Sequence, residues 1–466
     1  MNIFVLLINY NGDVIFYFVF SMNLDHFCRN GVIVTISVKD LKQLQGCCTY
    51  HEKETAFSKK THLKKPRVVC LAEVKNTTET TATVKLPKYL TPYKYKQTKY
   101  QINIHDTIQL HDSQKKYFDV MKQTLKEKQG MCLNLAAGTG KTVLAIKLIS
   151  LLKLKTIIIV HKEFLRDQWI DSIVKFTDLP RESIGIIQGQ QTETDKPITI
   201  AMLQSLWKKQ QLDIHYNLLI VDEVHNIGAE AFFKSLTTVL PICKYTLGLS
   251  GTTDRVDGLS PLFEAYLGKI VKPQATKQKT MLKVYIHYLD SKSDAYTSKV
   301  NSRTQMLDVV GITTSLAKYQ PRTEYIFKIL QQYIGQQVIV LSERVCFLDS
   351  LAGLLDNEGI SYTCNYGKHR TYKQTGNGII LATFAMASEA FDVQDLNVLL
   401  LASSISTPNK FLQSVGRINR NNCVQQNIPK IIVDFVDKPL QHQHNKRMKL
   451  LQDNFSVTSQ SITKEL

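Results

Sequence analysis

The chain has 466 residues, 44% hydrophobic and 21% charged, so it is long enough for two or three domains, each with a core of its own. Its 58 lysines and arginines against 40 acidic residues give a net charge of +18, which favours a polyanionic partner such as nucleic acid; the alternative is a basic surface that only aids solubility. Nine irregularly spaced cysteines argue against a disulfide framework and predict an intracellular, reducing compartment.

The first twenty residues are apolar, but we expect neither an export signal nor a membrane span. No lysine or arginine precedes Arg29, and the polar segment 9–13 interrupts the apolar run well short of the ~20 residues that a span requires. Its Asn-Gly pair is typical of a hairpin turn, and a start of the protein at Met22 is the other interpretation. The sequence therefore predicts no association with a membrane.

Short strand-like runs at 32–38, 68–74 and 80–86 predict a small β-rich N-terminal region. Residues 39–100 carry 14 basic and 5 acidic side chains. Four tyrosines alternate with four lysines there: Tyr89, Tyr93, Tyr95 and Tyr100 with Lys88, Lys94, Lys96 and Lys99. Lysines neutralise phosphates and aromatic rings stack on bases, so this segment is either a nucleic-acid surface or, equally well, a solvated linker.

Beyond residue 100, apolar strands alternate with helical stretches in two rounds. The strands are expected at 156–160, 198–201, 218–221 and 245–250, and then at 338–341, 378–382, 398–401 and 430–435. Fully apolar strands that alternate with helices indicate parallel sheets covered on both faces. We expect an accessory region at 1–104, α/β domains at 105–275 and 280–437, and a tail at 438–466 made of a short charged helix and a polar end.

A candidate phosphate loop lies between an apolar run that ends at Leu135 and the helical run 143–152. The loop, residues 136–142, reads Ala-Ala-Gly-Thr-Gly-Lys-Thr. Glycines let backbone N–H groups approach a polyphosphate, Lys141 supplies a positive charge, and Thr142 supplies a hydroxyl for Mg²⁺. Leu135 stands where this motif usually begins with glycine.

Two adjacent carboxylates follow the apolar strand expected at 218–221. Parallel α/β sheets bind ligands at the carboxyl ends of their strands. Asp222 is therefore a candidate for holding hydrated Mg²⁺, and Glu223 for accepting a proton from an attacking water. A solvated strand end is the alternative interpretation, which the preceding phosphate loop disfavours.

These motifs resemble those of superfamily 2 helicases, specifically the DExH group. Further segments resemble the remaining helicase motifs in the expected order: 110–114, 160–169, 201–206, 248–258, 338–344, 381–392 and 413–420. Leu135 and the segment 255–258 resemble the branch that holds XPB-type and UvsW-type helicases and the DNA helicases of poxviruses and other large DNA viruses, with the poxvirus-type transcript-release helicase nearest. The resemblance implies two tandem RecA-like parallel-sheet domains.

The resemblance also implies roles for individual residues. Contacts with ATP are expected from Gln114, Ala137, Gly138, Thr139, Gly140, Lys141, Thr142, Asp222, Glu389 and Asp392, with Mg²⁺ at Thr142 and Asp222. Catalytic roles are expected for Glu223, Gln413, Arg417 and Arg420. Arg417 and Arg420 are three apart, share one helix face, and would act as arginine fingers. Nucleic-acid contacts are expected from Gln204, Arg255, Ser342, Arg344 and Thr383.

The implied function is an ATP-dependent DNA helicase or translocase of 3′-5′ polarity, serving viral transcription, transcript release, replication or repair. Transcription or replication proteins would be partners, and a viral chain would act in the host cytoplasm, the nucleus or the virion. Two alternatives stay open: an RNA helicase, and an ATP-driven subunit that remodels nucleoprotein complexes without separating strands. The chain departs from the family pattern at Gly251, usually alanine, and at Ala390, usually glycine.

Overall fold

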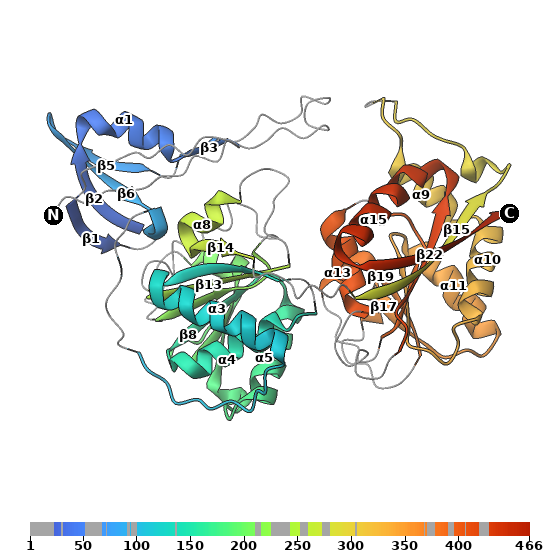
Figure 1. Cartoon of the computed structure of the whole chain (residues 1–466), viewed down its shortest axis with the longest axis horizontal. Coiled ribbons are helices and arrows are strands. Elements are labelled where there is room, and N and C mark those ends of the chain that lie inside the picture. Colours follow the sequence, from blue (N-terminus) through green and yellow to red (C-terminus); the bar gives the residue numbers. More distant parts are fainter. Residues whose placement is uncertain are drawn as a thin grey trace. The chain divides into compact units, whose positions relative to one another are not determined.

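The computed structural model divides the chain into two compact units that follow each other in sequence near residue 274 (Figure 1). It describes residues 23–28, 31–51, 68–70, 72–90, 94, 100–135, 138–209, 216–224, 243–251, 260–272, 280–302, 305–367, 369–370, 378–389, 396–405, 407–418 and 428–466. None of the helices within these ranges is long and apolar enough to cross a membrane. The expected hairpin at 9–13 lies outside them.

A small antiparallel sheet forms the N-terminal region, as expected. Its strand order is β1-β2-β6-β5, with bounds Asn23–Cys28, Gly31–Ser37, Thr81–Leu86 and Glu73–Thr77. The expected strand 32–38 ends at Ser37, because the Ser37 side chain accepts a hydrogen bond from the backbone N–H of Lys39 and caps helix α1 (Val38–Cys47). Beside this sheet, β3 (Thr49–His51) pairs with β4 (Val68–Cys70).

The segment that follows this sheet begins with a short 3₁₀ helix, η1 (Lys88–Leu90), which bonds to backbone groups later in the first unit. Lys88 is only 3% exposed, and its Nζ donates to the backbone oxygen of Lys244 over 2.7 Å. The hydroxyl of Tyr89 donates to the backbone oxygen of Gln129 over 2.9 Å. For Lys88 both interpretations, a nucleic-acid surface and a solvated linker, are wrong, because the fold buries its side chain. Tyr89 is half-buried.

The other members of the Tyr–Lys alternation are placed only in part. Lys94 is exposed and Tyr100 is half-buried. Tyr93, Tyr95, Lys96 and Lys99 lie outside the described residues.

The first unit is built on an eight-stranded sheet of order β10-β9-β11-β8-β12-β13-β7-β14. In that order the strands are Gln191–Thr192, Ile184–Gln188, Ile198–Met202, Thr156–Val160, Leu218–Val221, Tyr245–Ser250, Gly130–Asn134 and Lys269–Val271. Only β10 is antiparallel to its neighbour. The described helices are α3 (Asp112–Lys128), α4 (Lys141–Leu152), α5 (Glu163–Phe176), α6 (Leu203–Lys208) and α8 (Pro261–Leu267).

Alternate residues of these strands feed two separate cores. Ile158 and Ile220 pack with residues from α3, α4 and α5, whereas Ile157 and Leu219 pack with residues from α6 and α8. Both faces of the sheet are therefore covered, which explains why β8, β11 and β12 are apolar at nearly every position.

The second unit repeats this architecture with a sheet of order β18-β17-β19-β16-β20-β21-β15-β22. In that order the strands are His369–Arg370, Tyr362–Tyr366, Ile379–Thr383, Val338–Ser342, Val398–Leu401, Ile431–Asp437, Met281–Asp290 and Ser456–Glu465. Helices α9 (Val309–Ala317), α10 (Gln320–Gln331) and α11 (Val345–Asn357) supply one core. Helices α12 (Phe384–Glu389), α13 (Pro408–Ile418) and α15 (Gln441–Asn454) supply the other. The expected fold class is confirmed.

The polar C-terminal end forms a strand, which the sequence analysis did not predict. The short charged helix is present as α15, but residues 456–465 form β22, which runs parallel to β15 along its whole length. Nine of its ten residues are exposed. Its sequence does not show the apolar alternation that is typical of a half-buried strand. The backbone ladder with β15 determines its conformation instead.

Candidate active site

The phosphate loop connects β7 to α4 and requires its two glycines. Gly138 and Gly140 have φ angles of 82° and 83°, in the left-handed region that glycine adopts without strain. A Cβ on Gly140 would also collide with the side-chain nitrogen of Gln114. Lys141 opens α4, and its Nζ donates to the backbone oxygen of Leu135 over 3.2 Å. Ala137 lies outside the described residues.

Gln114 lies in the first turn of α3 and touches the phosphate loop. Its side-chain oxygen accepts a hydrogen bond from the backbone N–H of His111 over 3.1 Å, and its amide nitrogen lies against Gly140. The side chain is 7% exposed. The structure thus brings Gln114 and the loop together, while the recognition of adenine by Gln114 stays a prediction.

Asp222 follows β12, and two N–H groups hold its carboxylate in place. The indole Nε1–H of Trp169 donates to Oδ2 over 2.8 Å, and the backbone N–H of Glu223 donates to Oδ1 over 2.9 Å. Burial, reinforced by the negative charge of Glu223, raises the pKa of Asp222 to about 6, against the opposing effects of Trp169 and Lys141. A bound divalent cation would favour the ionised form.

Glu223 has a backbone conformation that non-glycine residues rarely adopt, with a φ of 47°. Such a conformation costs ~1–2 kcal/mol for an L-residue, and strained residues of this kind cluster at functional sites. This backbone strain, which no sequence pattern predicts, supports a functional role for Glu223.

The strand ends that carry these residues are neighbours in the sheet. β12 pairs with β13, and β13 pairs with β7 in a register that sets Ser250 opposite Asn134. A Cβ on Gly251, which follows β13, would lie 3.7 Å from Lys141 Nζ, an ordinary van der Waals contact, so this position lies beside the lysine of the phosphate loop. The phosphate loop, Asp222 and Gly251 therefore meet at one edge of the sheet.

The side chains at this edge fit a magnesium–phosphate group. Mg²⁺ prefers oxygen ligands and is usually bound by one or two protein groups together with substrate phosphates. The Thr142 hydroxyl, on the first turn of α4, and the Asp222 carboxylate are such groups. Within the described part of the chain, no cluster of three or more His, Cys, Asp or Glu side chains could hold a metal by itself.

Helix α13 of the second unit carries two of the residues expected to be catalytic. Gln413 is 8% exposed, and Arg417 is half-buried with its Nε–H donating to the backbone oxygen of Ala387 over 2.9 Å. This bond ties α13 to α12, which ends at Glu389. The side chain of Glu389 and residues Asp392, Ala390 and Arg420 lie outside the described part of the chain.

The described residues among those expected to contact nucleic acid lie at or just after strand ends, mostly within local hydrogen bonds. Gln204 is exposed at the start of α6, and its side chain donates to the backbone oxygen of His161 over 3.0 Å. The Ser342 hydroxyl is buried and accepts from the backbone N–H of Arg344 over 3.1 Å. Arg344 itself donates to the Thr314 hydroxyl over 2.9 Å.

Thr383 is the remaining described residue of this set. The Thr383 hydroxyl accepts from the backbone N–H of Met386 over 3.4 Å. Arg255 lies outside the described residues. Ser342 therefore shapes the loop after β16, and Thr383 caps the first turn of α12. Gln204 is the exposed side chain among those of the set that the structure describes.

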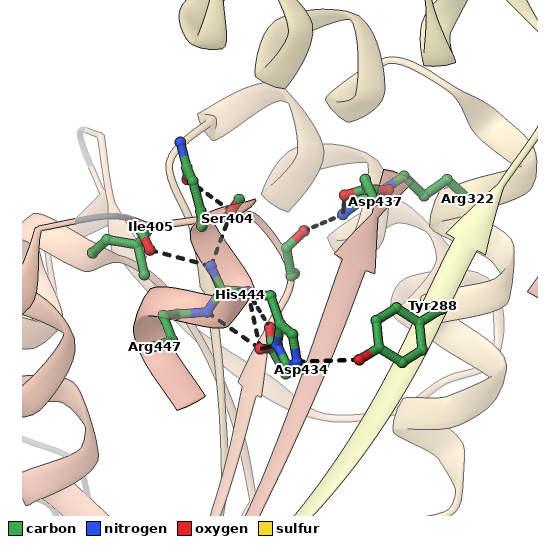
Figure 2. A network of polar contacts seen from close by, with 10 residues as sticks. Tyr288, Arg322, Ser404, Ile405, Asp434, Asp437, His444 and Arg447 are labelled. Atoms are coloured by element: carbon green, nitrogen blue, oxygen red, sulfur yellow. Dashed lines mark hydrogen bonds and ion pairs between the residues drawn. The ribbon is translucent and has the colours of Figure 1, made fainter. Parts of the chain in front are cut away.

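A buried polar network in the second unit escaped the sequence analysis, and it fixes the loop 402–405 that leads into α13 (Figure 2). Arg447 on α15 donates to the Ser404 hydroxyl over 2.9 Å and to the Ile405 backbone oxygen over 3.1 Å. Arg322 on α10 donates to the Ala402 backbone oxygen over 2.7 Å. Nothing in the spacing of these arginines distinguishes them from surface residues.

Two aspartates balance these buried arginines. Asp437 pairs with Arg322, and Asp434 pairs with Arg447 and accepts from His444 Nδ1 over 2.8 Å. Burial by itself would raise the pKa of Asp434, but the charge of Arg447 and the His444 bond outweigh it and lower the pKa. The loop that leads into the helix with Gln413 and Arg417 is thus held by Arg322 at Ala402 and by Arg447 at Ser404 and Ile405.

The fold and the site together define a phosphate-loop α/β protein with tandem RecA-like units. Residues 95–255 match the family model described as "Type III restriction enzyme, res subunit". The fragment structure of an HsdR subunit of a type I restriction enzyme from Vibrio vulnificus shares the fold, with a TM-score of 0.52 and 17% identity over 76% of this chain and 68% of that one.

Similar proteins come from large DNA viruses and archaea. Helicase L396 of Acanthamoeba polyphaga mimivirus, named as an ATP-dependent RNA helicase, is 30% identical over 70% of this chain and 64% of its own length. Helicase 161L of Invertebrate iridescent virus 6 is 27% identical over 70% and 77%. The DNA 3′-5′ translocase XPB2 of Sulfurisphaera tokodaii is 26% identical over 68% and 80%. The match thus spans just under two thirds of the mimivirus protein.

The chain is similar to superfamily 2 helicases of the branch that includes the XPB and UvsW helicases.

Proposed function

We propose that this protein hydrolyses ATP and couples the reaction to movement along DNA, as a helicase or translocase of 3′-5′ polarity. The observation that carries the proposal is the edge of the first sheet where the phosphate loop, Lys141 and the Asp222–Glu223 pair meet. A purely structural protein would not need Glu223 in a strained backbone conformation, together with a glycine loop that leads directly into Lys141.

In this proposal, backbone N–H groups of the loop and Lys141 bind the β- and γ-phosphates of ATP. Thr142 and Asp222 hold Mg²⁺, which supplies charge neutralisation on the phosphate oxygens when bound. Glu223 accepts a proton from the water that attacks the γ-phosphate. Gln114 contacts the adenine ring, and Glu389 and Asp392 are assigned further contacts with ATP.

Gln413, Arg417 and Arg420 complete the proposed reaction. Planar guanidinium groups stabilise the charge that develops on the γ-phosphate. Because these residues belong to the second unit, hydrolysis would change the relation between the units and move the strand. Gln204, Arg255, Ser342, Arg344 and Thr383 are assigned to the sugar-phosphate backbone, which positions a strand without reading its sequence.

DNA is favoured as the substrate because XPB2 is named a DNA translocase and UvsW an ATP-dependent DNA helicase. The mimivirus relative is named an RNA helicase, so RNA is the second candidate. Remodelling without strand separation is the third, with transcription or replication proteins as partners. A reducing intracellular compartment (host cytoplasm, nucleus or virion) is proposed from the irregular spacing of the nine cysteines.

Steady-state ATP hydrolysis with no polymer, single-stranded DNA, duplex DNA or RNA tests this proposal. We expect stimulation by DNA, abolished by Lys141→Ala. Stimulation by RNA alone would overturn the substrate, and an active ATPase that no polymer stimulates would favour the remodelling subunit. A chain that neither binds nor hydrolyses ATP would overturn the proposal.

A further inference from the structure

We propose that Trp169 is a positioning residue for Asp222: its indole N–H fixes the carboxylate in the orientation that Mg²⁺·ATP requires. The inference rests on the proposed function, because it assigns Asp222 to the magnesium site. It concerns a residue on α5, a helix that supplies none of the expected site residues.

The geometry ties the indole to the carboxylate through a single strong contact. Trp169 is 1% exposed, and its Nε1 lies 2.8 Å from Asp222 Oδ2. Asp222 is 6% exposed, so water competes little for this bond. An indole N–H can only donate a hydrogen bond, so the atom of Asp222 that faces it must be an acceptor oxygen.

The two N–H donors act on different oxygens of the same group. Trp169 occupies Oδ2, and the backbone N–H of Glu223 occupies Oδ1. One contact alone would leave the carboxylate free to rotate, whereas two contacts fix its plane. A carboxylate has about four acceptor sites, so each oxygen keeps capacity for a hydrated cation. Groups that orient a metal ligand in this way typically contribute 10- to 100-fold to metal affinity.

The alternative is that Trp169 serves only to pack the core. The ring does lie among the apolar residues shared by α3, α4 and α5. The two roles separate chemically, because phenylalanine retains most of the ring packing and removes the N–H donor. A packing role would change stability, and a positioning role would change the response to Mg²⁺.

The test compares Trp169→Phe with the matched change Trp207→Phe at the chain's other tryptophan. ATP hydrolysis is measured against Mg²⁺ concentration, together with binding of a fluorescent ATP analogue in EDTA and the Tm. We expect Trp169→Phe to raise the half-saturating Mg²⁺ concentration ~10-fold or more. Nucleotide binding in EDTA, and the Mg²⁺ response of Trp207→Phe, should stay within ~2-fold of the wild type.

A second readout does not depend on activity or on the folding of Trp169→Phe. Trp207→Phe leaves Trp169 as the sole tryptophan, so its emission reports the environment of the Asp222 carboxylate. We expect Mg²⁺ to change this emission when a non-hydrolysable ATP analogue is present. Adding Asp222→Asn to this single-tryptophan chain should remove the change.

The outcomes separate the inference from the proposed function. If wild-type protein binds no nucleotide, the proposed function fails, and the inference fails with it. If the wild type hydrolyses ATP but Trp169→Phe shows an unaltered Mg²⁺ response, or Trp169 emission ignores Mg²⁺, the inference alone is overturned. A lowered Tm with a normal Mg²⁺ response assigns Trp169 to packing.

Discussion

Arg447 and Asp434 form a buried, bidentate ion pair between helix α15 and strand β21. Arg447 Nη2 lies 2.7 Å from Asp434 Oδ1, and its Nε lies 3.2 Å from Oδ2 (Figure 2). The same guanidinium reaches the loop 402–405, so the C-terminal helix holds the start of the helix that carries Gln413 and Arg417. Helix α15, which follows the last helicase motif in the sequence, thus supports the motif on α13.

Removing this arginine should cost both stability and activity. Arg447→Ala leaves Asp434 charged and buried, which typically destabilises a protein by about 3–5 kcal/mol. We expect urea unfolding to show this loss. We also expect the ATPase kcat to fall while binding of a fluorescent ATP analogue stays near normal, because the loop before α13 loses its anchor.

Arg322→Lys and Arg447→Lys test whether the fork geometry of the guanidinium matters. Lysine keeps the charge but cannot make the bidentate contact together with the loop bonds. If Arg447→Lys restores full kcat, charge alone holds the loop, and the positioning account is contradicted.

The phosphate loop should not tolerate a side chain at Gly140. Gly140→Ala places a methyl group against Gln114 and strains a φ of 83°, so we expect the affinity for ATP to fall at least ~10-fold. Gly353→Ala is the matched control, because it lies exposed within α11 with open space around its added Cβ. That change should be neutral or stabilise the chain by ~1 kcal/mol. Equal ATP binding by the two variants would contradict the placement of Gly140.

Buried Lys88 should make stability depend on pH. Burial lowers the pKa of Lys88 to about 7, whereas the unfolded chain has an ordinary lysine pKa near 10.5. Between these values the unfolded state binds the extra proton, so the free energy of unfolding rises with pH across this window. The penalty for the buried charge is fully present below pH 7.

Lys88→Met should remove this rise. The stability difference between wild type and Lys88→Met should grow by at most about 1.4 kcal/mol per pH unit from pH 7 to 9 in the wild type's favour. Urea unfolding at three pH values measures it, with Lys94→Met, at an exposed lysine, as the control. A difference that is constant with pH would show that Lys88 keeps the same charge state when the chain folds.

The sequence predicted the architecture well where the pattern of apolar residues determines the secondary structure. Strands such as β8 and β12 are continuous apolar runs. The phosphate loop follows β7, and Asp222–Glu223 follow β12. β22 escaped because an exposed polar strand carries no alternation and depends on pairing with β15. The bond from Trp169 was not predicted, because a tryptophan in an apolar helix is usually a core residue. The burial of Lys88 was not predicted, because it depends on backbone acceptors far away in the sequence.

The most direct test of the account is ATP-driven displacement of a labelled third strand from duplex DNA. Glu223→Gln is run beside the wild type, because it keeps the shape of the side chain but removes the proposed general base. We expect the wild type to displace the strand only with ATP and Mg²⁺, and Glu223→Gln to bind ATP and DNA yet be at least ~100-fold slower. Displacement by Glu223→Gln at the wild-type rate, or by wild type without ATP, would contradict the account.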